Sequence, residues 1–127
     1  MILHAETALL PEGWATDVRI RVEGGRIAEV TPNSVPEGAR LGCLLAAPVN
    51  LHSHTFQRAM AGMTEARTAG QDSFWTWRTL MYRFLERLSP EDVQAIAAQA
   101  MVEMAESGFA SVCEFHYLHH PVGGGTY

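Results

Sequence analysis

An apolar run that ends in two histidines constrains the fold of this chain more than any other feature. Residues 44–51 are almost all apolar, and His52 and His54 follow directly. Such a run is typical of a strand buried on both faces, as in a parallel sheet covered by helices. Side chains two apart point to the same face of a strand, so Asn50, His52 and His54 share a face. We therefore predict one buried strand over this region, with paired imidazoles at its C-terminal end.

Two helices and a second strand are predicted after this run. Apolar residues recur at helical spacing over residues 73–88, with Asp72 as the expected N-cap. Ser89 is expected to cap a second helix, because a proline and two acidic residues follow it. Gly108 is placed to end that helix, and residues 109–117 are predicted as a strand. Strand, helices and strand form a βαβ unit, which implies parallel strands and an α/β fold.

The first 42 residues are predicted to be β structure. The alternating runs 16–23 and 26–30 are joined by Gly24 and Gly25, as in a hairpin whose tight turn needs positive φ at both central residues. A loop rich in proline and glycine is expected over residues 32–38.

The composition excludes several classes of protein. Of the 127 residues, 47% are hydrophobic and 18% are charged, which is typical of a globular protein and argues against disorder. The formal net charge of −5 gives no basic surface for nucleic acid or an anionic membrane. There is no apolar stretch of about 20 residues and no secretory signal. Cys43 and Cys113 are isolated thiols, so we expect a reducing, cytoplasmic location.

The paired histidines suit a metal ion. Two imidazoles on one strand face can both reach one ion at about 2.1 Å, and parallel α/β folds build their sites at the carboxyl ends of strands. Two incidental histidines are the alternative, and their place after a buried-type strand favours the metal site. We predict that His52 and His54 are metal ligands.

Three segments resemble the N-terminal third of formimidoylglutamate deiminases, which belong to the amidohydrolase superfamily of metal-dependent hydrolases. They read APVNLHSHTFQRAMAG, DSFWTWRTLMYRFLERLSPE and EFHYLHH, within residues 44–120. Val49 and Thr55 stand where the family usually has Pro and Ala. The resemblance implies that residues 1–43 are β-sandwich strands. It implies that residues 44–127 are the first βαβ portion of an incomplete (β/α)8 barrel.

The resemblance also implies roles for five residues. His52 and His54 would bind a catalytic divalent metal, most often zinc. Gln57 and Tyr117 would contact the substrate, and Arg78 would bind a carboxylate of its glutamate portion. A planar guanidinium suits a carboxylate because it can form two parallel hydrogen bonds. Considered without the resemblance, Arg78 is an exposed residue on the polar side of its helix.

The implied reaction is hydrolysis of N-formimidoyl-L-glutamate to N-formyl-L-glutamate and ammonia, in histidine degradation. The expected partner is this small dicarboxylate, and a homo-oligomer is compatible with the full-length parent. A complete barrel takes about 250 residues, so we expect the remaining metal ligands and the acid–base residues to lie outside this chain. No catalytic residue is therefore assigned. We expect the isolated chain to be inactive and poorly folded.

Three alternatives stay open. One is another amidohydrolase-type deaminase acting on guanine, cytosine or a triazine, although a neutral ring needs no carboxylate clamp such as Arg78. Another is a small metal-binding or interaction module that also uses His116 and His119. The last is an inert remnant.

Three further assignments concern aromatic, histidine and acidic residues that stand out in the sequence. Trp75 and Trp77 are predicted to be core residues of an amphipathic helix. The histidines of the FHYLHH segment are assigned to a strand end and a loop. Glu114 lies inside a predicted strand and is given no role.

Overall fold

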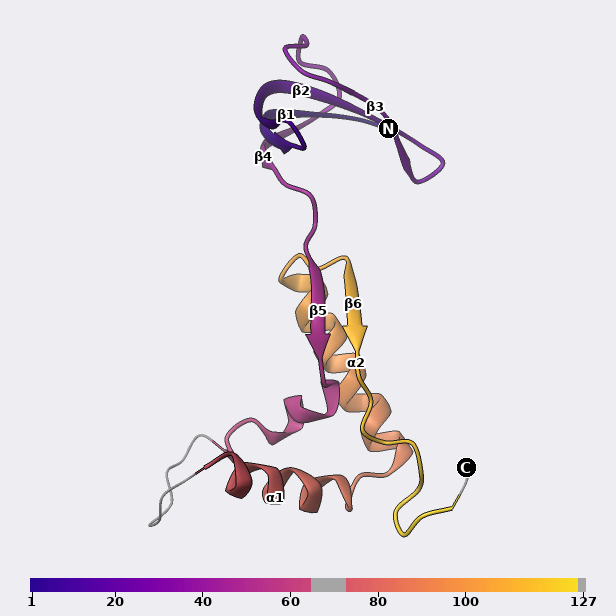
Figure 1. Ribbon diagram of the computed structural model, residues 1–127. Helices are drawn as coiled ribbons and strands as arrows, with labels where there is room; N and C mark the ends of the chain where they lie inside the picture. The colour runs from indigo at the N-terminus through magenta and orange to yellow at the C-terminus, as the bar shows by residue number, and fades with distance from the viewer. Residues whose placement is uncertain (65–72, 126–127) are drawn as a thin grey trace. The chain divides into compact units, whose positions relative to one another are not determined.

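The computed structural model describes residues 1–64 and 73–125 (Figure 1). The chain divides into two compact units, Met1–Ala47 and Pro48–Tyr127, and each is described by itself. Asp72, the predicted cap of the first helix, lies outside the described residues.

The first unit is a four-stranded sheet. Its strands are β1 (Ile2–Leu10), β2 (Gly13–Glu23), β3 (Arg26–Thr31) and β4 (Ala39–Leu44). They lie side by side in the order β3-β2-β1-β4. The β1–β2 and β2–β3 pairs are antiparallel, whereas β4 runs parallel to β1.

The predicted hairpin is confirmed. β2 and β3 pair with Ile20 opposite Val30, and Gly24 and Gly25 turn the chain with φ of 57° and 75°. Both angles are in the left-handed region that glycine adopts without a steric penalty. A small buried apolar cluster of this sheet consists of Ala5, Ala8, Val18 and Ile20, with Val18 and Ile20 on one face of β2.

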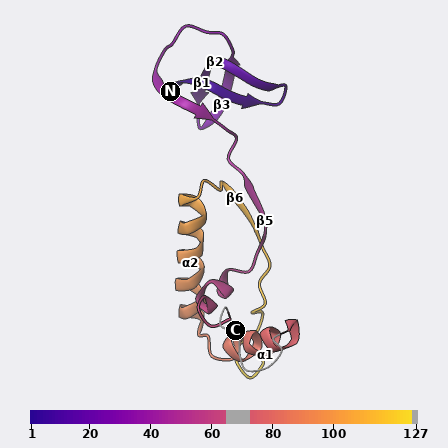
Figure 2. The ribbon, with the colours of Figure 1, turned by 90° about the vertical axis from the view of Figure 1, so that its left-hand side faces the viewer.

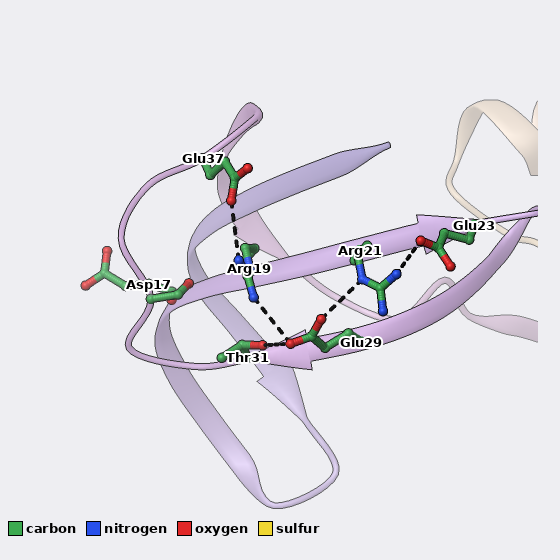
Figure 3. A network of polar contacts seen from close by, with 8 residues as sticks. Asp17, Arg19, Arg21, Glu23, Glu29, Thr31 and Glu37 are labelled. Atoms are coloured by element: carbon green, nitrogen blue, oxygen red, sulfur yellow. Dashed lines mark hydrogen bonds and ion pairs between the residues drawn. The ribbon is translucent and has the colours of Figure 1, made fainter.

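The other side of the β2–β3 hairpin carries a network of ion pairs (Figure 3). Arg19 bonds Glu29 and Glu37, and Arg21 bonds Glu29 and Glu23. The pKa of Glu29 is lowered, first by the hydrogen bond from Thr31 and then by the two arginines. These groups are largely exposed, so water screens their attraction and the network adds little to stability.

The prediction of one buried strand over residues 44–54 is wrong. Residues up to Leu44 belong to β4 in the first sheet, and residues 45–48 are in neither a strand nor a helix. β5 (Val49–Ser53) starts afterwards in the second unit, where Leu51 is 76% exposed. Pro48 has no N–H to donate to a strand ladder. Burial on both faces also depends on covering layers, which an apolar run does not reveal by itself.

The second unit is a βαβ arrangement, as predicted. Its elements are β5, the 3₁₀ helix η1 (Thr55–Met60), α1 (Phe74–Leu85), α2 (Pro90–Glu106) and β6 (Ser111–Glu114). β5 and β6 pair in parallel, with Val49 opposite Ser111. α2 runs along one side of this strand pair (Figure 2). Asn50 of β5 contacts Met104 of α2, with the amide nitrogen 3.1 Å from the sulfur.

The predicted start and end of the second helix are confirmed. The Ser89 hydroxyl accepts a hydrogen bond from the Asp92 amide at 3.1 Å, and Pro90 lies in the first turn. Gly108 follows the helix with a φ of 91°. The first helix begins after Ser73, whose N–H donates to the Thr76 hydroxyl at 3.0 Å.

A second buried cluster joins η1 to α1. Its buried residues are Phe56, Met60, Met81 and Leu85. Trp77 packs against this cluster, whereas Trp75 is 69% exposed, so the core prediction is wrong for Trp75. Trp75 is not among the side chains that pack in or against this cluster. No helix among the described residues is long and apolar enough to cross a membrane.

Candidate metal centre

The predicted histidine pair meets at the C-terminal end of β5. His52 lies within the strand and His54 is the first residue after it. Their Nε2 atoms are 2.9 Å apart, and the ring planes cross at 77°. The two-residue period of the strand therefore brings both imidazoles to one point, as the sequence predicted.

A main-chain carbonyl sets the orientation of the His54 ring. His54 Nδ1 is 3.0 Å from the carbonyl oxygen of Phe115, just beyond β6. A carbonyl oxygen can only accept, so Nδ1 must carry the proton and donate. In the neutral ring, Nε2 then presents its lone pair toward His52. Metal-bound histidines commonly have this arrangement, with the second ring nitrogen bonded to a carbonyl.

The pair fits a divalent metal that accepts nitrogen ligands. Two nitrogens at about 2.1 Å from one tetrahedral ion lie about 3.4 Å apart. The observed 2.9 Å is close to this spacing, so a small rotation of either ring suffices. Over residues 1–64 and 73–125, no group of three or more metal-binding side chains gathers. Catalytic zinc sites use three protein ligands, so this pair alone is one ligand short of such a set.

Tyr117 lies beside the pair. Its ring is 5.1 Å from the His54 ring, in an edge-to-face arrangement, and 5.5 Å from Phe56. Phe115 also meets both His54 and Tyr117 edge-on. The structure therefore brings Tyr117, which is 63 residues later in the chain, next to the predicted metal ligand.

Gln57 lies in η1, three residues after His54. Its side-chain nitrogen is 3.6 Å from the sulfur of the buried Met81. It borders an open depression of about 420 Å³ that Trp77 and Arg58 also line. Gln57 is thus near the histidines along the chain, and its described side-chain contact is directed toward α1.

Arg78 is exposed on α1, and its guanidinium carbon lies 4.6 Å above the centre of the Tyr82 ring. Within residues 1–64 and 73–125, Arg78 makes no hydrogen bond, ion pair or ring contact with the histidine pair. Among the described residues, His116, His119 and His120 form no metal-binding cluster with the histidine pair. His116 lies 3.9 Å from Glu114, and His120 bonds the Gly125 carbonyl.

Glu114, to which the sequence assigned no role, lies near the pair and contacts Thr55, the residue after His54. Its Oε1 accepts hydrogen bonds from the Thr55 amide at 2.8 Å and the Thr55 hydroxyl at 2.9 Å. Burial raises the pKa of Glu114, but the hydrogen bonds from the Thr55 amide and from the Ser53 and Thr55 hydroxyls outweigh it, and the net pKa is lowered. The predicted strand over residues 109–117 placed Glu114 in its interior, whereas β6 ends at Glu114, so this position was not apparent from the sequence.

Comparisons with known proteins show the family of the chain. Residues 1–40 match the family model "Formimidoylglutamate deiminase HutF, N-terminal domain", and residues 43–125 match the "Amidohydrolase family". A curated formimidoylglutamate deiminase from Pseudomonas aeruginosa is 52% identical over 98% of this chain. A crystal structure of an amidohydrolase from Brucella melitensis superposes with a TM-score of 0.90 and 45% identity over 99% of the chain. The chain spans 28% of the first relative and 29% of the second. Because the amidohydrolase model matches well over half of its residues, the chain belongs to the amidohydrolase family.

Proposed function

We propose that this chain supplies two metal ligands and part of the substrate pocket of a formimidoylglutamate deiminase. The observation that carries the proposal is the His54 ring, which donates to the Phe115 carbonyl and faces His52 through Nε2. The likeness to the curated deiminase supports the choice of substrate. The reaction would convert N-formimidoyl-L-glutamate and water to N-formyl-L-glutamate and ammonia.

His52 and His54 would hold a divalent metal, and two imidazole donors favour zinc. When bound, the metal supplies Lewis-acid activation of water at neutral pH. The Phe115 carbonyl keeps the His54 Nε2 lone pair available for the metal. His52 must present Nε2 without its proton, so binding requires a change of tautomer in that ring.

The proposed substrate contacts follow from side-chain chemistry. Tyr117 lies beside His54 and can donate its hydroxyl to the bound molecule. Gln57 can donate or accept through its amide. Arg78 would bind a substrate carboxylate with two parallel hydrogen bonds, because stacking over Tyr82 leaves the in-plane N–H groups of the guanidinium for an anion.

The same proposal covers the organisation of the chain. The first unit, Met1–Ala47, would be part of a small β-sandwich, and the second, Pro48–Tyr127, would begin a (β/α)8 barrel; Leu44, the predicted first residue of the barrel part, lies in β4 of the first sheet. The parallel β5–β6 pair with α2 along one side supports the barrel assignment. We further propose a cytoplasmic enzyme, since the two described thiols are not paired.

Ammonia release measures this function directly, in the intact natural protein that contains the chain. We expect turnover of N-formimidoyl-L-glutamate in preference to guanine, cytosine or a triazine. Arg78→Ala should lower kcat/KM about 10- to 100-fold, as for a lost charge-assisted hydrogen bond. Arg83→Ala, an exposed arginine on the same helix, is the matched control and should have little effect. A preference for a heterocycle, or equal effects of both variants, would contradict the proposal.

A further inference from the structure

The end of β6 contacts the chain on both sides of His54. The Phe115 amide donates to the Ser53 carbonyl at 3.0 Å, one residue before His54. The Glu114 carboxylate accepts from the Thr55 amide at 2.8 Å, one residue after it. The His54 ring itself donates to the Phe115 carbonyl. Three hydrogen bonds between two strand ends therefore surround one proposed metal ligand.

The Glu114–Thr55 contact replaces a missing helix cap. His54 occupies the N-cap position of η1, and its side chain makes no capping bond. The first amides of a helix have no partner within it, so the Thr55 N–H needs an acceptor from elsewhere. Glu114 provides that acceptor and takes the Thr55 hydroxyl as well. Thr55 is 3% exposed and the Glu114 side chain 11%, so little water is present to replace the carboxylate.

We propose that Glu114 is a positioning residue for the metal centre: by holding Thr55, it fixes the backbone turn that aims His54 Nε2 at the metal. The inference rests on the proposed function for its metal, and it goes beyond that function by assigning a residue that touches neither metal nor substrate. Without the carboxylate, the start of η1 loses its anchor. The His54 ring then loses the backbone geometry that aligns Nδ1 with the Phe115 carbonyl. Loss of such outer contacts typically lowers metal affinity 10- to 100-fold.

Zinc affinity tests the proposal without relying on activity. Competition with a chromophoric chelator gives the Kd for zinc in the intact natural protein that contains the chain. We expect Glu114→Ala to weaken zinc binding about 10- to 100-fold. Glu114→Gln retains an amide oxygen as acceptor and should fall between Glu114→Ala and the parent protein. Thr55→Ala keeps the main-chain bond and loses only the hydroxyl bond, so its effect should be smaller than that of Glu114→Ala.

Two control variants separate positioning from general destabilisation. Leu85→Ala removes a buried side chain of the second cluster and should lower the melting temperature while leaving the zinc Kd within about threefold. Glu86→Gln changes an exposed carboxylate at the end of α1 and should change neither quantity. If Glu114→Ala does not fold, the zinc Kd values of Glu114→Gln and Thr55→Ala are compared with that of Leu85→Ala. Weaker zinc binding in the first two variants than in Leu85→Ala would still support the positioning role.

Unchanged zinc affinity in the Glu114 variants, or an equal loss in Leu85→Ala, would overturn the proposal. A parent protein that binds no zinc would overturn it too, together with the metal assignment. Failure of the proposed function looks different. In that case the parent binds zinc and the Glu114 variants lose affinity as expected, while N-formimidoyl-L-glutamate is not turned over.

Discussion

The two units of the chain keep their shapes in different ways. In Met1–Ala47, each of four strands hydrogen-bonds a neighbour, and two glycines close the β2–β3 hairpin. Among the described residues of Pro48–Tyr127, one pair of strands forms, and a small cluster joins η1 to α1. The first unit is therefore organised by backbone ladders that join all four of its strands. The second depends on side-chain contacts between distant segments.

The residues of the proposed site all belong to the unit that depends on contacts between distant segments. The histidine pair, Tyr117 and Glu114 belong to the second unit, and the contacts among them join residues about 60 positions apart. Parallel strands must be connected by a long crossover, so such contacts are a normal result of this topology. The first unit contributes no residue to the described site.

The largest expected effect tests the second cluster. Met81 is 2% exposed, so Met81→Ala should cost about 2–5 kcal/mol of unfolding free energy through lost burial and a cavity. Met101, on α2 and 36% exposed, offers the same substitution at a less buried place, and Met101→Ala should cost well under half as much. Urea unfolding followed by circular dichroism measures both. Equal losses of unfolding free energy in the two variants would show that the cluster of Phe56, Met60, Met81 and Leu85 does not stabilise the packing of η1 against α1.

A somewhat smaller effect is expected from a turn in the first unit. Gly38 has a φ of 79°, and a Cβ there would overlap the Ile2 carbonyl oxygen of β1. Gly38→Ala should therefore cost about 1–3 kcal/mol, as for other residues held in strained backbone conformations. Gly42→Ala is the control, because its Cβ would meet nothing within 4 Å. Amide hydrogen exchange of β1 and β4 should rise in the first variant only. If Gly38→Ala and Gly42→Ala have equal effects, the backbone conformation at Gly38 does not stabilise this unit.

Local capping of α2 is expected to matter less again. Ser89→Ala removes the acceptor of the Asp92 amide, and loss of such a cap costs about 1 kcal/mol. Ser107→Ala, at the other end of the helix, should cost about 0.5 kcal/mol or less, as is usual for surface changes. Hydrogen exchange of the first turn of α2 distinguishes the two. A larger loss from Ser107→Ala would contradict the assignment of Ser89 as the cap.

The smallest effect concerns an exposed ion pair and its dependence on pH. Hydrogen bonds from Arg58 and then Gln99 lower the pKa of Glu103 to about 2, from 4.5. Because the folded-state pKa is the lower one, the contribution is complete above pH 4.5 and is lost as the pH falls toward 2. The stability difference between the parent chain and Glu103→Gln should shrink over that interval and in high salt. Glu29→Gln gives the same test in the first unit. A stability difference between the parent chain and Glu103→Gln that grows as the pH falls would contradict the lowered pKa of Glu103.

Much of the fold could be predicted from local sequence. The Gly24–Gly25 hairpin, the Ser89 cap and the end of α2 at Gly108 each depend on a few neighbouring residues with fixed backbone preferences. Leu51 and Trp75 were predicted to be buried and are exposed. Burial depends on which layers cover a residue, and apolar character alone does not specify that.

The sequence by itself determined that His52 and His54 share one strand face, because the two-residue period of a strand is a local property. It also determined the βαβ order of the second unit. The tertiary structure decided which groups surround that pair. β6 pairs in parallel with β5, and this pairing brings three groups to the end of β5. The Phe115 carbonyl and the Tyr117 ring contact His54, and the Glu114 carboxylate contacts Thr55. Strand pairing joins residues far apart along the chain, and no local pattern specifies which side chains then meet.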